Sequence, residues 1–82
     1  MKIEILGTGC AKCNMLEAAT KSAADSIGLD YEIEHIKEIG EIIQRGVMMT
    51  PALAIDGQVK ASGRVPSSDE LIRILRDSNK TA

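Results

Sequence analysis

Two cysteines, Cys10 and Cys13, stand three positions apart near the start of the chain. On the first turn of a helix, this spacing brings the two Cα atoms to about 5 to 6 Å, which is within reach of a disulfide. A bridge across two intervening residues closes almost no loop, so it would add little to the free energy of unfolding. The pair therefore indicates redox chemistry or metal binding rather than a structural crosslink.

The neighbourhood of the two cysteines predicts different tasks for them. A short strand, Lys2 to Leu6, gives way through Gly7-Thr8-Gly9 to a helical pattern, so Cys10 lies at a helix N-terminus. Unpaired N–H groups and the helix dipole lower the pKa of a thiol there, and we expect Cys10 to be the attacking thiolate. Cys13, one turn deeper, faces the core and is placed to resolve a mixed disulfide. Lys12 either lowers the pKa of Cys10 further or lies in water, and we favour the second.

The elements that must position this turn follow from hydrophobic periodicity and turn residues. After the first strand, the sequence predicts a helix from Ala11 to Ile27, a strand from Tyr31 to Ile36 and a short helix over Ile39 to Val47. Two further strands, Ala52–Ile55 and Gln58–Ala61, flank an Asp56-Gly57 hairpin turn. A last helix is capped by Ser67 and Glu70 and ends near Asp77. We expect the chain to fray from Asn79 to Ala82. The order βαβαββα predicts an α/β sandwich with two parallel first strands, a hairpin at one edge and three helices covering both faces.

Composition limits the classes of function. A chain of 82 residues, 44% of them hydrophobic, predicts one globular domain over residues 1–82. A net charge of −2 and a single aromatic residue argue against a nucleic-acid partner, because neither a basic field nor a stacking platform is present. The sequence shows no apolar run of transmembrane length and no secretory signal pattern. We therefore expect no membrane partner and a cytoplasmic protein.

The element order, the Cys-x-x-Cys pair after the first strand and Thr50-Pro51 before the third strand together resemble the thioredoxin fold. The turn from Gly7 to Cys13 resembles its minimal branch, the small prokaryotic thioredoxin-like or glutaredoxin-like redox-active disulfide proteins. The resemblance extends from Lys2 to about Leu75. It implies a three-layer sandwich with a mixed four-stranded sheet, and a thiol-disulfide oxidoreductase that needs no organic cofactor.

The resemblance also implies roles for residues outside the pair. Pro51 would follow a cis peptide bond and pack against the cysteines, and Thr50 would offer backbone groups to an extended substrate segment. Gly63 resembles the glycine that lets a loop approach the thiols. Glu4 falls six positions before Cys10, where thioredoxins place a buried acid that assists proton transfer. Strand alternation also permits a solvent-facing Glu4, and we favour that placement.

The chain departs from familiar thioredoxins inside the motif itself. Gly9 replaces the tryptophan before the first cysteine, and Ala11-Lys12 replaces Gly-Pro between the two cysteines. These departures leave the substrate range and the reduction potential open.

Our leading hypothesis is disulfide exchange with protein or small-thiol substrates, with the dithiol restored by a reductase or by glutathione. This interpretation assigns no metal ligand. A second hypothesis is a soft-metal carrier, because two thiolates at this spacing can hold Cu(I). Small copper chaperones, however, follow the order βαββαβ. A third hypothesis is an interaction module whose partner binding depends on the disulfide state.

Overall fold

The computed structural model describes residues 1–9 and 11–80. Strands and helices alternate in the predicted order βαβαββα. The elements are β1 (Lys2–Leu6), α1 (Ala11–Ser26), β2 (Glu32–Ile36), α2 (Ile39–Gln44), β3 (Ala52–Ile55), β4 (Gln58–Ser62) and α3 (Ser68–Lys80). The predicted fold class, a thioredoxin-like α/β sandwich, is confirmed.

The four strands form one mixed sheet in the order β2-β1-β3-β4. β1 runs parallel to β2 and antiparallel to β3, which continues into β4 through a tight hairpin. Asp56 and Gly57 both have positive φ at this turn, as an Asp-Gly hairpin requires. The pairing of β3 with β4 is interrupted by a register shift between Leu53 and Ala54. β1 is thus a central strand, and β2 and β4 are the two edges.

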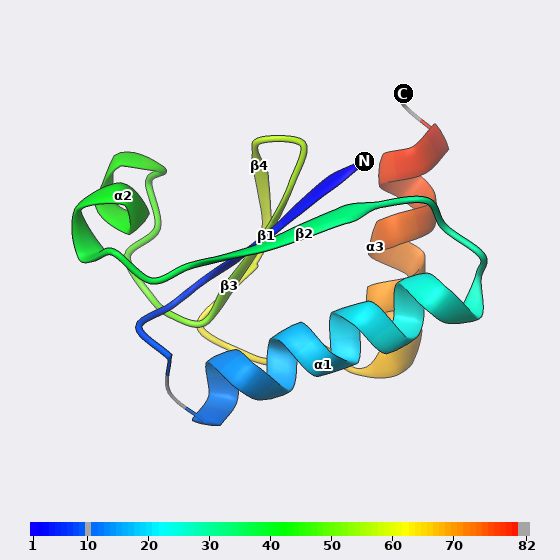
Figure 1. Ribbon diagram of the computed structural model, residues 1–82, viewed down its shortest axis with the longest axis horizontal. Helices are drawn as coiled ribbons and strands as arrows, with labels where there is room; N and C mark the ends of the chain where they lie inside the picture. Colours follow the sequence, from blue (N-terminus) through cyan, green and yellow to red (C-terminus); the bar gives the residue numbers. More distant parts are fainter. Residues whose placement is uncertain (10, 81–82) are drawn as a thin grey trace.

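Helices cover both faces of this sheet (Figure 1). α1 and α3 pack on one face, toward which β1 directs Ile3 and Ile5. α2 packs on the other face, where Leu6 belongs to a smaller cluster. The larger cluster comprises Ile3, Ile5, Leu16, Ala23, Ala24, Leu53, Ile55, Ala61, Leu71 and Leu75. Because both faces are covered, four of the five residues of β1 are buried. The turn that follows β1 therefore starts from a well-packed strand end.

α3 begins with the predicted cap and runs further than expected. Ser67 Oγ accepts a hydrogen bond from the backbone N–H of Glu70 at 3.2 Å, but the Glu70 carboxylate pairs with Arg64 instead of returning to the cap. The helix continues to Lys80, beyond the predicted end near Asp77. The fraying expected from Asn79 to Ala82 stays a prediction. Residues 81 and 82 lie outside the described residues. Among the helices that the structure describes, none is long and apolar enough to span a membrane.

Candidate active site

The turn after β1 brings the second cysteine against the backbone of the strand end. Cys13 lies in the first turn of α1 and is fully buried. A Cβ built on Gly7 would lie 2.2 Å from Cys13 Sγ, so the sulfur occupies the space that any side chain at this position would need. The same Cβ would lie 3.9 Å from the Cα of Pro51. Gly7 is therefore the point where the predicted pair and the predicted proline loop meet, whereas Cys10 lies outside the described residues.

The proline loop has the conformation that the resemblance implied. The peptide bond between Thr50 and Pro51 is cis, and Pro51 is buried. The backbone N–H of Gly63 donates a hydrogen bond to the carbonyl oxygen of Pro51 at 2.9 Å, which joins the loop after β4 to the loop before β3. Gly63 has a φ of 77° and lies under Met49, whose Cβ and Cε would be 3.3 Å from an added Cβ. The structure thus places Cys13, Pro51 and Gly63 in one connected neighbourhood.

We expected Glu4 to face solvent, but this prediction was wrong, because Glu4 is buried. Only 3% of its surface is accessible, because β1 directs it toward α2 rather than toward water. Its Oε1 accepts a hydrogen bond from Arg45 Nη1, while its Oε2 is buried without a hydrogen-bond partner among the described residues. The hydrogen bond to Glu4 raises the pKa of Arg45. The sequence alone did not predict a role for Arg45. The one feature that could have indicated its contact with Glu4 is its position directly after the short helix α2.

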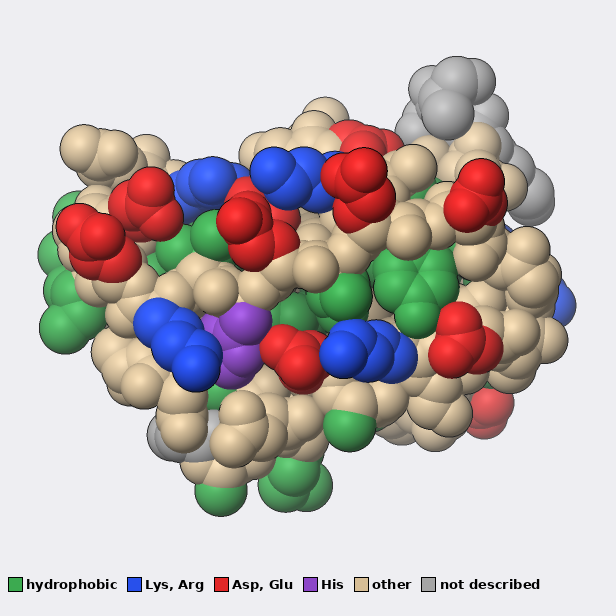
Figure 2. Space-filling view, in the orientation of Figure 1, with side chains coloured by type: hydrophobic (Ala, Val, Ile, Leu, Met, Phe, Trp, Pro, Cys, Tyr) green, Lys and Arg blue, Asp and Glu red, His purple; other side chains and the backbone are tan. Residues whose placement is uncertain are grey.

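Other charged side chains of the described residues have local partners. Arg64 forms two hydrogen bonds with the carboxylate of Glu70, which raises the pKa of Arg64 and lowers that of Glu70. His35 Nδ1 lies 3.0 Å from Glu17 Oε1, which joins β2 to α1. Figure 2 shows the histidine among acidic and basic side chains on this face. Lys12 is exposed on the first turn of α1.

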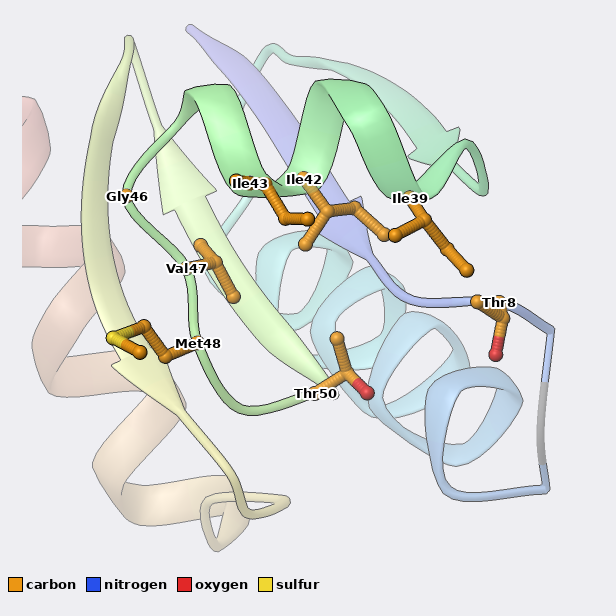
Figure 3. A pocket seen from close by; sticks show the side chains of 8 residues that line it. All are labelled: Thr8, Ile39, Ile42, Ile43, Gly46, Val47, Met48 and Thr50. Carbon is orange, nitrogen blue, oxygen red and sulfur yellow. The ribbon is translucent and has the colours of Figure 1, made fainter.

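A groove of about 640 Å³ opens beside the loop that carries Thr50. Figure 3 shows Ile39, Ile42 and Ile43 directed from α2 into the space that Thr8 and Thr50 border. Eight residues line it, none of them charged: Thr8, Ile39, Ile42, Ile43, Gly46, Val47, Met48 and Thr50. In the sequence, the three isoleucines form only a helical stripe, and Gly7 is one of two glycines in a turn, so neither pattern predicts the groove or the contact with Cys13.

Metal-binding side chains do not gather elsewhere in the described part of the chain. Within residues 1–9 and 11–80, no group of three or more His, Cys, Asp or Glu side chains is arranged to hold a metal ion.

Comparison with known proteins agrees with this fold. Residues 1–76 match a family model described as thioredoxin domain. A thioredoxin of Methanothermobacter thermautotrophicus is 48% identical over 75 residues, covering 92% of this chain and 97% of the relative. A thioredoxin of Methanocaldococcus jannaschii is 38% identical over 74 residues, covering 90% of this chain and 85% of the relative.

A mixed sheet with a buried cysteine beside a cis-proline loop defines a thioredoxin-like protein. The chain belongs to the thioredoxin family. It is a thiol-disulfide oxidoreductase. Thioredoxins in general act on disulfide-containing proteins and are served by reductases.

Proposed function

We propose that Cys10 and Cys13 are the redox pair of this oxidoreductase, with Cys10 as the attacking thiolate and Cys13 as the resolving thiol. The observation that carries the assignment is the burial of Cys13 against Gly7. A sulfur enclosed in this way is poorly placed to meet an external disulfide, whereas it is well placed to act on a neighbour in the same turn. The Cys-x-x-Cys spacing makes Cys10 that neighbour.

The exchange proceeds in two substitutions at sulfur. The Cys10 thiolate attacks one sulfur of the substrate disulfide, a mixed disulfide forms, and the other substrate sulfur leaves as a thiolate. Cys13 then loses its proton and attacks Cys10 Sγ, which forms the Cys10–Cys13 disulfide and releases the second substrate thiolate. The substrate gains two electrons and two protons, and the protein loses the same number. An external dithiol, or two molecules of a monothiol, must reverse the change before the next cycle.

Three residues support this exchange in the proposal. Pro51 packs beside the cysteine turn, and Thr50, which precedes it, is exposed and presents its backbone to an extended substrate segment. Gly63 holds the loop after β4 close to Pro51, since its N–H donates to the Pro51 carbonyl. A side chain at Gly63 would press on Met49 and would require a φ that other residues rarely adopt.

Two ionisable residues complete the proposed site. Lys12 lies within the turn between the cysteines, and its charge favours the thiolate of Cys10 over the thiol. Glu4 accepts the proton of Cys13 in this proposal. Its support is the buried Oε2, which keeps a free acceptor position while Arg45 binds Oε1.

The wider setting is part of the same proposal. We assign the protein to the cytoplasm. Both of its cysteines belong to the reactive turn, and the reducing conditions of the cytoplasm would keep them as thiols between cycles. Residues 1–82 act as one thioredoxin-like domain in electron transfer and redox homeostasis, supported by a family match over residues 1–76. The physiological reductant is a thioredoxin-type reductase or glutathione, and small-thiol disulfides are substrates beside protein disulfides.

Two serine variants test the assignment of the cysteines. Cys10→Ser should abolish reduction of a protein disulfide in the presence of dithiothreitol, because the attacking sulfur is gone. Cys13→Ser should accumulate a mixed disulfide, visible by intact mass as the protein plus one substrate thiol. Circular dichroism of both variants checks that the fold is kept. Full reductase activity in Cys10→Ser, or a mixed disulfide trapped on Cys13 instead, would overturn the assignment.

A further inference from the structure

Met49 carries a thioether that is open to solvent on one side and packed on the other. It directly precedes Thr50, and 64% of its surface is accessible. The three atoms nearest to a Cβ built on Gly63 all belong to Met49: Cβ and Cε at 3.3 Å and Sδ at 3.5 Å. The inner side of the Met49 side chain therefore lies on the backbone of Gly63, and its outer side meets water.

This contact lies over the point where two loops of the site are joined. The backbone N–H of Gly63, in the loop after β4, donates to the carbonyl oxygen of Pro51 at the start of β3. Met49 belongs to the segment before β3 and folds back over the other loop, so it covers the residue that donates this hydrogen bond. A thioether packs well on irregular backbone, because it is flexible, apolar and polarisable. We infer that the Met49 side chain limits the access of water to the bond beneath it.

The other methionines of the chain do not share this position. Met48 is 95% exposed, and Met15, on α1, is 60% exposed. Met1 is partly buried and packs against the larger core cluster. An oxidant in solution can reach the sulfur of Met48 or Met15 about as readily as that of Met49, but neither supplies an atom nearest to Gly63. The contact, and not the exposure alone, distinguishes Met49.

We propose that Met49 is an oxidation site at which a peroxide forms a sulfoxide, and that this sulfoxide weakens the hydrogen bond between Gly63 and Pro51 and slows disulfide exchange. The Met49 sulfur takes up one oxygen atom and loses two electrons. The O–O bond of the peroxide breaks, and its other oxygen leaves as water or as an alcohol. The effect on exchange rests on the proposed function of Cys10 and Cys13, whereas the oxidation and the weakened hydrogen bond do not.

The expected structural change follows from the polarity of the product. Oxidation turns a flexible apolar side chain into a polar one, which disturbs contacts that the thioether makes. An added oxygen has no room on the side of the sulfur that lies on Gly63, so the S–O group must point toward water. Hydration of this group competes with the packing on Gly63. The side chain then moves outward, and water gains access to the Gly63 amide.

The expected kinetic change follows from the neighbouring residue. Thr50 comes directly after Met49 and, in the proposed function, presents its backbone to the substrate. A segment that has lost its packing on Gly63 must be ordered again whenever a substrate binds, and this ordering opposes binding. Exchange with a protein disulfide should therefore become slower, although the sulfur of Met49 takes no part in the exchange.

The sulfoxide differs from the cysteine disulfide in how it is reversed. A dithiol restores the cysteine pair by exchange, whereas methionine sulfoxide is reduced by dedicated sulfoxide reductases. Exposure to a peroxide would therefore leave a lasting mark at Met49 after the redox pair has been restored. The protein would stay slow until Met49 is reduced.

The test applies hydrogen peroxide to the full chain after diamide has converted the cysteine pair to its disulfide, so that no thiolate consumes the peroxide. Intact mass counts the added oxygen atoms, peptide fragmentation locates them, and dithiothreitol then restores the dithiol. Hydrogen exchange of the Gly63 amide, followed by NMR, and reduction of a protein disulfide are measured before and after. The chains compared are the wild type, Met49→Leu, Met48→Leu and Met15→Leu. Leucine is close to methionine in volume and has no sulfur, and Met15 matches Met49 in exposure.

The proposal requires the same response from the wild type, Met48→Leu and Met15→Leu. Oxidation should speed exchange of the Gly63 amide about 5-fold, the change that corresponds to roughly one net hydrogen bond. It should lower kcat/KM by about 2- to 10-fold, the usual cost of ordering one long side chain on binding. Met49→Leu should gain oxygen at its other methionines and change in neither quantity. Sulfoxide reductases of both stereospecificities should return the wild type to its starting values.

Three results would overturn the proposal. One is a Gly63 amide that exchanges at the same rate whether or not Met49 is oxidised. The second is a loss of kcat/KM in Met49→Leu as large as that in the wild type, and the third is an unchanged kcat/KM in wild type whose Met49 is fully oxidised.

Failure of the proposed function would look different. If Cys10→Ser reduced the protein disulfide as fast as the wild type, the redox pair would be wrong, and the predicted slowing of exchange would lose its basis. The response of the Gly63 amide to peroxide would still decide whether Met49 is the oxidation site that loosens the two loops.

Discussion

The two faces of the sheet differ in how completely helices cover them. The face under α1 and α3 is closed by two long helices over a cluster of ten buried residues, among them Ile5, Leu53 and Leu75. The opposite face is covered by α2 alone, a helix of six residues, over a cluster of six. This smaller cover leaves two isoleucines exposed and one groove open, and it holds the buried Glu4 with its partner Arg45.

The two faces therefore contribute unequally to the stability of the fold. Apolar area removed from water stabilises the fold by about 25 cal/mol per Å², so the closed face contributes most of the hydrophobic free energy. The open face contributes less, and the groove on it has no charged lining residue. The end of β1 lies between them, which places the cysteine turn where a rigid core and an accessible surface adjoin.

The largest expected effect on stability comes from truncating a buried side chain on the face that α1 and α3 cover. Leu53→Ala removes a fully buried side chain from the central part of the sheet and should lower the free energy of unfolding by about 2 to 5 kcal/mol. Ile43→Ala, which truncates an exposed residue of the open face, should stay within about 0.5 kcal/mol of the wild type. Urea unfolding followed by circular dichroism measures both. Equal losses would show that the two faces contribute alike.

The next effect concerns the junction between the faces. Gly7→Ala places a methyl group where Cys13 Sγ lies, and displacing the sulfur should cost about 1 to 3 kcal/mol of stability. The displaced thiol of Cys13 should also react faster with iodoacetamide in the native protein. Gly40→Ala in α2 is the control, because its nearest neighbour would be at an ordinary 3.8 Å. An unchanged alkylation rate of Cys13 in Gly7→Ala would contradict the packing described for this turn.

A smaller effect should come from the ion pair of the open face. Arg45→Met leaves the buried Glu4 carboxylate without its hydrogen-bond partner and should lower the free energy of unfolding. The loss is moderated because the Arg45 side chain is 34% exposed and water reaches it. The double variant Glu4→Leu/Arg45→Met should recover most of the loss, since no charge is then buried. Thermal unfolding of the three proteins checks this, and a double variant less stable than Arg45→Met would contradict it.

The smallest effect is a pH dependence at the surface. Hydrogen bonding to Arg64 lowers the pKa of Glu70 in the folded protein, so this contact stabilises the fold above the unfolded pKa of the carboxyl group, and the stabilisation is lost as the pH falls through the folded pKa. Arg64→Ala should therefore be slightly less stable than the wild type at neutral pH and equal to it in strong acid. Unfolding midpoints across that range measure the difference. A difference that grows toward acid pH would have the wrong sign.

Most of the fold was predictable because its signals are local. The Asp56-Gly57 turn fixes a hairpin by backbone conformation alone, and the cap at Ser67 starts α3 where it was expected. The reactive turn was predictable for the same reason, since a glycine-rich stop and a cysteine pair are neighbours in sequence. The cis bond before Pro51 followed from family resemblance rather than from physics.

The errors arose where the outcome depends on distant partners. The alternation of Ile3, Glu4 and Ile5 is typical of a strand with one wet face, but β1 is covered on both faces, so Glu4 is buried. Its partner, Arg45, is 41 positions away in the sequence, so no local pattern links the two residues. The groove likewise requires the relative positions of Thr8, α2 and Thr50, which hydrophobic periodicity does not give.

The two edge strands of the sheet have a consequence for behaviour at high concentration. β2 carries Glu32 and Glu34, β4 carries Lys60, and the register shift in the β3–β4 ladder distorts the second edge. Charged side chains and irregular pairing at an edge discourage the addition of a further strand from another molecule. These features of β2 and β4 therefore oppose the growth of the sheet from one molecule to the next, which is the first step toward fibrils.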